Sequence, residues 1–341
     1  MKPSGAGVGG GGSGPIGAVV GALLRAGRSP WVRAGFLVLC IGAAVVAVAS
    51  ERDQVADAAR RLGAVPLLLA LIASLANVLL AGMSWRAVLA DLSSPLPLRA
   101  AARVFLLGQL GKYVPGSVLQ VMAQAELGRE YGVPRRRSAS ALVVQLIVAV
   151  TTALLLVLVA APFASGEAAR RFGPVLLLVP ALLVVLHPRL LNPLLNGVLR
   201  RFGREPLEHP TSVGGTARSG VWALLSWLAA GVQVTVLAVA LGAPLNVRTV
   251  ALSIGGYCLA WAVGFLVVVA PAGAGAREAA LAAALSPVLD GAELVVLVLA
   301  SRVLLTVADL ALAGVGAALG TRRPPGAVSD RPSSGGAGLG R

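Results

Sequence analysis

Seven long apolar runs constrain the fold of this chain more than any other feature. A helix needs about 20 apolar residues to cross a bilayer, and each run is close to that length. Hydrophobic residues make up 57% of the 341 residues and charged residues only 13%, which is too little polar surface for a soluble protein. The runs cover residues 31–49, 65–85, 140–163, 174–191, 220–241, 249–270 and 294–319.

Helices are the expected spanning elements, because no part of the chain shows the alternating segments of about ten residues that build membrane β-barrels. We therefore expect an all-α polytopic bundle of about seven or eight transmembrane helices, with one or two broken or re-entrant helices. The membrane domain is predicted to occupy residues 18–320. A disordered Gly-rich N-terminus, 1–17, and a disordered tail, 321–341, are expected to flank it.

The basic residues predict an orientation. The formal net charge is +15, and the arginines lie in short loops rather than in one patch, which argues against nucleic acid as a partner. The positive-inside rule then places both termini on the cytoplasmic side of the cell membrane, with loops 50–64, 164–173 and 242–248 outside. The arginines assigned to the cytoplasmic side are Arg25, Arg28, Arg33, Arg129, Arg135, Arg136, Arg137, Arg189, Arg200, Arg201, Arg204, Arg218, Arg322 and Arg323. No extramembrane stretch is long enough for a soluble catalytic domain.

The sequence shows no pattern for a metal or a cofactor. Cys40 and Cys258 lie alone in separate apolar runs, and His187 and His209 lie beside prolines in a basic loop. No nucleotide-binding loop is present either. We expect no metal site and no cofactor.

Two further apolar stretches, 98–125 and 275–289, do not fit an uninterrupted span. The first contains GKYVPGS (111–117) and is expected to enter and leave the membrane from one side. The second is opened by PAGAGARE (271–278) and is expected to cross or half-cross the membrane as a short helix. The residues that would shape these breaks are Gly111, Pro115, Gly116, Pro271, Gly273 and Gly275.

The two broken stretches predict a transport site. Each lies downstream of a similar lead-in, PLPLR (95–99) or PLNVR (244–248), and paired interruptions in two halves of a chain are typical of transporters. Irregular backbone persists at membrane depth only inside protein or beside water. Helix N-termini freed at such a break favour an anionic group.

Charged side chains gather at the same places. Lys112 and its neighbour Tyr113 lie in the first break, and Arg277 and Glu278 open the second helix. Arg302 lies near the middle of the last apolar run, where an unpaired charge costs at least about 2.5–3.5 kcal/mol. These five are the predicted substrate-binding residues. The predicted supporting charges are Glu126, Arg129 and Asp309. Asp309 lies about two helical turns after Arg302.

Structural roles are the alternative for these polar residues. Arg302 would pair with Asp309 or Glu278 to hold helices together, and Lys112 would extend from a shallow loop to the interface. Gln145, alone in the run 140–163, is expected to form an ordinary interhelical hydrogen bond. Gly316 and Gly320 are expected to be notches for helix packing.

The segments LGQLGKYVPGSVLQVMAQAELGREYGVPR (107–135) and VVVAPAGAGAREAALAAAL (267–285) resemble the lysylphosphatidylglycerol synthase membrane-domain family of flippase-like proteins. The resemblance covers roughly residues 31–319. It implies a helical bundle that moves a lipid, typically an aminoacylated phospholipid, between leaflets. The best-known members add a cytosolic aminoacyltransferase domain, and this chain resembles a stand-alone member without it. Relatives often carry charged residues in the span after the first motif, where this chain has only Gln145.

The leading functional hypothesis is a lipid flippase or transporter that is not an enzyme, with membrane lipids as partners. Lys112, Arg277 and Arg302 would hold an anionic headgroup, and the nearby carboxylates would position these cations or meet a cationic substituent. The alternative is a membrane-embedded glycosyl- or lipid-transferase that uses a lipid-linked donor, suggested by the acidic pair Glu51 and Asp53 outside the first run. A third possibility is a partner for a separately encoded lipid-modifying enzyme.

Overall fold

The structure, a computed structural model, describes residues 60–113, 118–164, 178–201, 206, 210–266 and 275–319. Within these ranges it is helical and contains no β-strand. Five described helices are long and apolar enough to cross a membrane. They confirm the all-α membrane fold and five of the seven predicted runs: α4 (Ala64–Asp91), α7 (Arg135–Ala160), α11 (Val213–Ala240), α12 (Val247–Leu266) and α14 (Gly291–Ala318). The predicted run 31–49 and both predicted tails lie outside the described residues.

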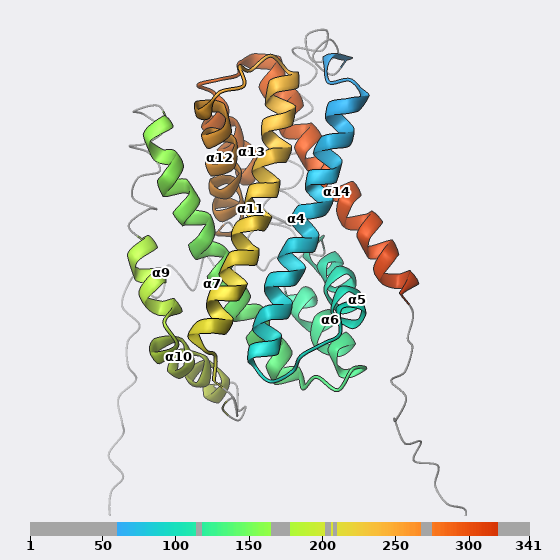
Figure 1. The fold of residues 1–341 in the computed structure, drawn as a ribbon, viewed down its shortest axis with the longest axis vertical. Coiled ribbons are helices and arrows are strands. Elements are labelled where there is room, and N and C mark those ends of the chain that lie inside the picture. Colours follow the sequence, from blue (N-terminus) through green and yellow to red (C-terminus); the bar gives the residue numbers. More distant parts are fainter. Residues whose placement is uncertain are drawn as a thin grey trace, which may run out of the picture.

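Shorter helices fill the spaces between these spans. The first broken stretch forms α5 (Leu98–Gln109), the 3₁₀ turn η1 (Leu110–Tyr113) and α6 (Val118–Arg129). The second gives α13 (Ala276–Leu285), whose ten residues are about 15 Å long and too short to cross the bilayer core. The helices α5 and α6 lie side by side at the lower end of the molecule, whereas α13 packs beside α12 in its upper half (Figure 1).

The prediction of one span over residues 174–191 is wrong. In the described part of this region, α9 (Leu178–Leu186) ends before His187, and a separate helix, α10 (Pro188–Arg201), follows. Pro188 lacks a backbone N–H and disfavours helical geometry at the residue before it, so the chain bends at this point. The basic segment that we predicted as loop is therefore partly helical: α10 lies at the lower end of the bundle (Figure 1).

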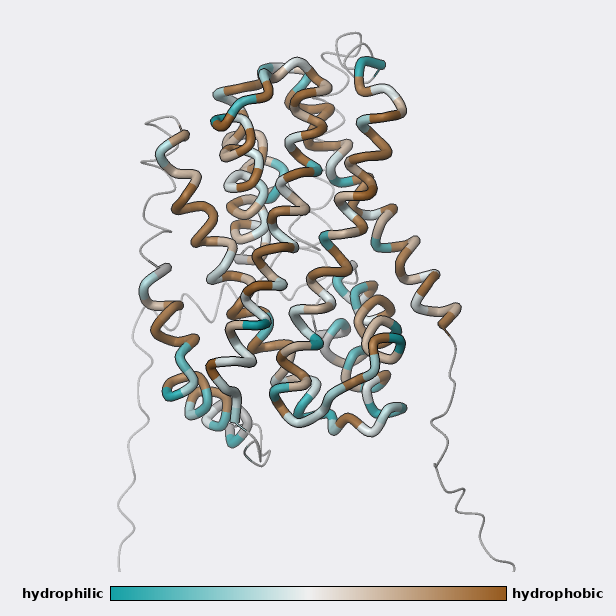
Figure 2. Tube along the Cα trace, viewed as in Figure 1, coloured by the Kyte–Doolittle hydropathy of each residue, from teal (hydrophilic) through white to brown (hydrophobic). Residues whose placement is uncertain are grey.

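Apolar side chains face outward as well as inward. On α4, Val65 is 68% exposed and Ile72 is 53% exposed, although both belong to a helix of the central bundle. Such faces are unfavourable in water and favourable in lipid. Hydrophobic residues cover the middle of the molecule, and hydrophilic residues gather at the lower end, around α5, α6 and α10 (Figure 2).

Small residues let the spanning helices approach closely. A Cβ on Gly231 of α11 would lie 2.9 Å from the Cα atom of Ile254 on α12. A Cβ on Gly255 would collide with Ala160 of α7, and one on Gly256 would lie 2.8 Å from the Cβ atom of Ala284 on α13. Close backbone approach of this kind supports helix association in membranes, where the hydrophobic effect does not drive helices together. The prediction that Gly316 is a packing notch is confirmed, since a Cβ added there would lie 3.2 Å from the Cβ atom of Leu106.

A polar contact joins the lower ends of α4 and α11, which pack along much of their lengths (Figure 1). The Asp91 carboxylate accepts hydrogen bonds from the Ser212 backbone N–H, at 2.7 Å, and from the Ser212 hydroxyl, at 2.5 Å. Ser212 in turn caps α11 by accepting from the Gly215 N–H at 2.9 Å. A carboxylate at a helix N-terminus also complements the helix dipole, so this contact fixes where α11 begins.

Candidate functional site

The first break places Lys112 at the turn between α5 and α6. The two helices are linked by a hydrogen bond from the Gln120 side-chain amide to the Gln109 side-chain oxygen, at 2.8 Å. Gly108 permits this hairpin, because a Cβ there would collide with the Gln124 side chain. The hairpin confirms that the stretch 98–125 is broken and that its two arms pack together. Residues 114–117, with the predicted Pro115 and Gly116, lie outside the described residues.

Lys112 forms an ion pair with the last spanning helix. Its Nζ lies 2.6 Å from Oδ2 of Asp309 on α14; the Asp309 side chain is completely buried and that of Lys112 is 27% exposed. Isolated charges in such surroundings are costly, so each residue stabilises the charged form of the other. The contact joins the first break to α14, because Lys112 belongs to η1 and Asp309 to α14.

The second break is organised by Glu278. Gly275, just before α13, has φ of +84°, a conformation that side-chain-bearing residues rarely adopt. The Gly275 N–H donates to Oε2 of Glu278 at 2.6 Å, and Oε1 of Glu278 lies 3.4 Å from Nε of Arg302 on α14. One carboxylate therefore caps α13 and pairs with the central arginine of α14. Residues 267–274, with the predicted Pro271 and Gly273, lie outside the described residues.

Arg277 packs against an aromatic ring. Its guanidinium carbon lies 4.8 Å from the ring centroid of Tyr257 on α12, within the range of a cation–π interaction. The Tyr257 hydroxyl accepts a hydrogen bond from Asn77 of α4 at 3.5 Å, and Ser226 of α11 donates to the Asn77 side-chain oxygen at 2.7 Å. The chain of contacts thus runs from α13 through α12 to α4 and α11.

Sequence reasoning missed Tyr257 and Asn77. Each is an uncharged polar side chain within an apolar run, a pattern typical of an ordinary interhelical hydrogen bond. The sequence could have indicated both residues, because each carries a hydrogen-bonding group within an apolar run and such a group needs a partner there.

These contacts place five of the predicted residues in one region, which we call the charge cluster: Lys112, Arg277, Glu278, Arg302 and Asp309. Three of its members are cations and two are carboxylates. Arg277 and Arg302 both lie within electrostatic range of the Lys112 ammonium. Of the two carboxylates predicted as partners for Arg302, Glu278 lies 3.4 Å from its Nε, and Asp309 contacts Lys112.

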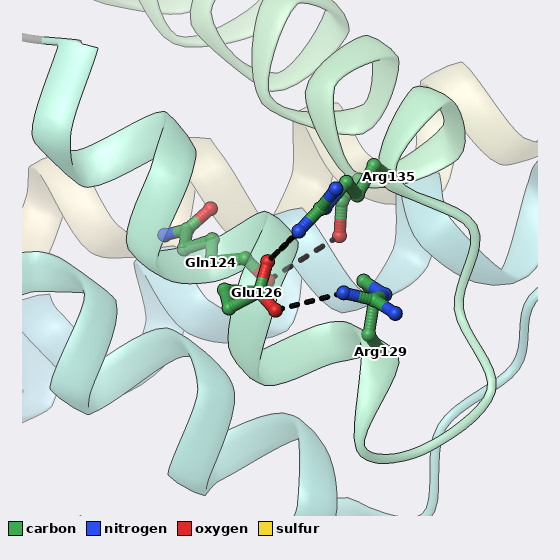
Figure 3. Close-up of polar contacts among 5 residues, drawn as sticks. Gln124, Glu126, Arg129 and Arg135 are labelled. Carbon is green, nitrogen blue, oxygen red and sulfur yellow. Dashed lines mark hydrogen bonds and ion pairs between the residues drawn. The ribbon is translucent and has the colours of Figure 1, made fainter.

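Glu126 and Arg129, predicted as supporting charges, lie in a separate exposed group. Glu126 is 2.9 Å from Arg129 on the same helix and 2.5 Å from Arg135 at the start of α7. Figure 3 shows the Glu126 carboxylate between these two arginines. The hydrogen bond from Arg135, followed by the positive charges of Arg135 and Arg129, lowers the pKa of Glu126 below its ordinary value. The group joins α6 to α7 rather than to the charge cluster.

The remaining predicted residues have these positions. Tyr113 ends η1, and its side chain is outside the described part of the structure. Gly111 lies in η1 next to Lys112. Gln145 forms the expected interhelical hydrogen bond, from its amide to the Ala81 carbonyl of α4 at 3.3 Å. The acidic pair Glu51 and Asp53 lies outside the described residues.

Comparison with known proteins gives one family. A family model described as the lysylphosphatidylglycerol synthase TM region matches residues 32–313. The match contains both breaks and every member of the charge cluster. No curated protein matches the chain.

Proposed function

Because the chain belongs to the lysylphosphatidylglycerol synthase TM-region family, we propose that it is a lipid flippase or transporter that moves an anionic or aminoacylated phospholipid between membrane leaflets. The observation that carries the proposal is the charge cluster, in which three cations and two carboxylates meet between two broken helices inside an apolar bundle. Ionisable groups at this depth are costly, and they commonly mark the path of a polar substrate.

The mechanism follows from which elements carry the cluster. Lys112 belongs to the hairpin α5–η1–α6 at the lower end, and Arg277 and Glu278 belong to α13, which packs beside α12 in the upper half (Figure 1). A headgroup at the cluster contacts both halves, while its acyl chains remain among the apolar faces of the spanning helices. Movement of one broken element relative to the other would expose the headgroup to alternate sides.

The same proposal includes an orientation in the cell membrane. The lower end of the molecule carries the start of α7, the start of α11 and helix α10 (Figure 1). These segments contain most of the described loop arginines, including Arg135, Arg189 and Arg218. We assign this end to the cytoplasm by the positive-inside rule, with α14 ending on the same side.

Reconstitution tests the proposed activity. Vesicles that contain the purified protein and a trace of tail-labelled fluorescent phosphatidylglycerol are treated with dithionite, which quenches only the outer leaflet. The protein should raise the quenched fraction above the half seen in protein-free vesicles. Replacing both arginines of the cluster, in R277Q/R302Q, should reduce the rate of translocation at least about tenfold. This corresponds to an increase of about 1.4 kcal/mol or more in the activation free energy. Wild-type protein that leaves the inner-leaflet label protected would contradict the proposal.

A further inference from the structure

We propose that α10 is an interfacial helix that binds the anionic lipid surface at the lower end of the molecule, on the side assigned above to the cytoplasm. This surface lies apart from the charge cluster, and its occupant is the headgroup layer of the leaflet rather than a transported molecule. The contact does not depend on lipid transport, and only the name of the leaflet rests on the proposed orientation. Three sides of α10 face three different surroundings.

The side of α10 that faces the bundle fixes how the helix is turned about its axis. Leu191 and Leu195, one turn apart, are buried in the apolar cluster that contains Trp85 of α4. The Asn192 side-chain oxygen accepts hydrogen bonds from the Thr211 N–H at 2.9 Å and from the Thr211 hydroxyl at 2.8 Å. Its amide donates to the Thr211 carbonyl at 3.1 Å, just before α11 begins. The fold therefore determines the directions of the other described side chains of α10.

A second side of α10 is apolar and uncovered. Leu190 is 50% exposed and Leu194 is 49% exposed, and both lie on a flank about 100° around the helix from the buried side. The preceding helix α9 also exposes Leu183 and Val184. Since α10 runs across the lower end of the bundle, where hydrophilic residues gather, its apolar flank meets the boundary of the apolar region (Figure 1, Figure 2). Acyl chains next to the headgroups are the surroundings that stabilise such a flank.

The third side of α10 is basic. Arg189 and Arg200 are both exposed and lie about three turns apart, so they share a flank about 110° from the exposed leucines. The sequence contains no acidic residue between Glu167 and Glu205. An apolar flank beside a basic flank is typical of helices that lie in the plane of a membrane surface, and guanidinium groups pair with phosphate oxygens. The helix therefore fits an anionic headgroup layer better than a neutral one.

A second copy of the chain fits this surface less well. Two copies that paired across both flanks of α10 would oppose their arginines, and like charges repel. A lipid layer instead offers phosphates to Arg189 and Arg200 and acyl chains to Leu190 and Leu194 at the same time.

The depth of α10 is measured on the full chain in vesicles of phosphatidylcholine mixed with phosphatidylglycerol. In the C40S/C258A background, L194C carries a nitrobenzoxadiazole label, and a labelled R200C is the matched control on the basic flank. Lipids with a nitroxide near the glycerol end of the acyl chain should lower the emission at L194C at least about twofold and leave R200C nearly unchanged. Iodide on both sides of the vesicles should have the opposite preference.

The role of charge is measured as the selectivity of the label at L194C for anionic lipid. Trace nitroxide-labelled phosphatidylglycerol should quench it about twofold to fivefold more than an equal fraction of nitroxide-labelled phosphatidylcholine. In R189Q/R200Q this ratio should fall to about one, and high salt should lower it without any substitution at the arginines, because ions screen the attraction. R277Q/R302Q removes the same number of charges from the charge cluster. It should keep the wild-type ratio, which distinguishes a lipid surface from a lipid held as substrate.

Three results would overturn the proposal. Quenching of the label at L194C by iodide but not by lipid nitroxides would contradict an interfacial position. Equal quenching by the two labelled lipids, or an equal loss of selectivity in R189Q/R200Q and R277Q/R302Q, would contradict an anionic lipid surface as the occupant. Self-quenching that disappears when the labelled protein is diluted with unlabelled protein would assign the flank to a second copy instead.

Discussion

At the scale of single residues, the contact between Lys112 and Asp309 illustrates how one ion pair determines the placement of a helix break. Asp309 is completely buried on α14, and Lys112 reaches it from η1. Breaking a buried pair by removing one partner typically costs about 3–5 kcal/mol, because the other charge is left uncompensated. The hairpin is therefore held against α14 by a charge–charge contact in addition to its apolar packing.

This contact gives a stability prediction. Asp309→Asn should lower the free energy of unfolding by about 3–5 kcal/mol, since Lys112 loses its counter-ion. Denaturation in detergent, monitored by circular dichroism, measures the change. The double variant K112M/D309L, which removes both charges, should recover most of the loss. If D309N alone is as stable as wild type, the pair does not hold the hairpin.

Tyr257 gives a second prediction at this scale. Removal of the ring in Tyr257→Leu should reduce phosphatidylglycerol affinity by about threefold to thirtyfold, because a desolvated cation–π contact contributes about 1–2 kcal/mol to the position of Arg277. Tyr257→Phe keeps the ring and loses only the hydrogen bond from Asn77, so it should stay close to wild type. The rise in melting temperature of the detergent-solubilised protein on addition of dihexanoyl phosphatidylglycerol measures both variants. Equal losses in the leucine and phenylalanine variants would assign the effect to the hydroxyl instead.

Residue chemistry also explains what was predictable. Lys112, Arg277, Glu278, Arg302 and Asp309 were all identified from the sequence, because a charge in an apolar run needs a partner. The sequence left two partners open for Arg302, since Asp309 lies at helical spacing from it and Glu278 belongs to another helix; it gave no sign that Asp309 contacts Lys112. Glu126 was misplaced because it is near the break in sequence, while α6 carries it about 12 Å along the helix from Val118 and away from the cluster.

At the scale of elements, spans and breaks were predicted better than helix ends. The runs of about 20 apolar residues marked α4, α7, α11, α12 and α14, and glycine with proline marked both breaks. The prediction of one span over 174–191 was wrong because mean hydropathy does not register the bend at Pro188. Hydropathy also gave no indication that the following basic segment is a helix, because an amphipathic helix has low mean hydropathy.

The crossing of α11 and α12 gives a prediction at this scale. Gly231→Ala should destabilise the protein by about 1–3 kcal/mol, because the added Cβ meets the backbone of Ile254 and the helices have to separate. Gly220→Ala is the matched control on the same helix, since nothing lies within 4 Å of its added Cβ. The control should be neutral or slightly stabilising because alanine is the better helix former. Equal melting temperatures for wild type and G231A would contradict this packing.

The joint between α6 and α7 should depend on pH. The pKa of Glu126 is lowered in the folded protein, so its carboxylate contributes stability above the ordinary value of 4.5, and that contribution is lost as the pH falls through the lowered pKa. Glu126→Gln should therefore lower the melting temperature slightly at neutral pH. The difference between wild type and E126Q should vanish under strongly acidic conditions. A difference that stays constant with pH would contradict the role of the charge.

At the scale of the whole molecule, the two broken elements reach the charge cluster from different parts of the bundle. The hairpin with Lys112 belongs to the lower end and α13 to the upper half, and their charges meet against α14 (Figure 1). The sequence predicted two breaks, but it offered no means of deciding that they approach one another from opposite sides. That relation depends on the packing of helices that are far apart along the chain.

Orientation can be tested on the intact cell. In a C40S/C258A background, a cysteine at Leu245, which is 73% exposed between α11 and α12, should react with a membrane-impermeant maleimide added outside. A cysteine at Glu130, in the exposed turn between α6 and α7, should react only after the membrane is permeabilised. The reverse pattern would invert the proposed topology.

The glycines of α12 have a mechanical consequence. Gly255 faces α7, Gly256 faces α13, and Ile254 covers Gly231 of α11, so α12 is in near-backbone contact with three neighbours within a single turn. A helix seated in this way resists a piston-like shift along its axis, because even a small translation drives methyl groups into main chain. In the movement proposed for transport, α12 is therefore expected to stay fixed against α7 and α11.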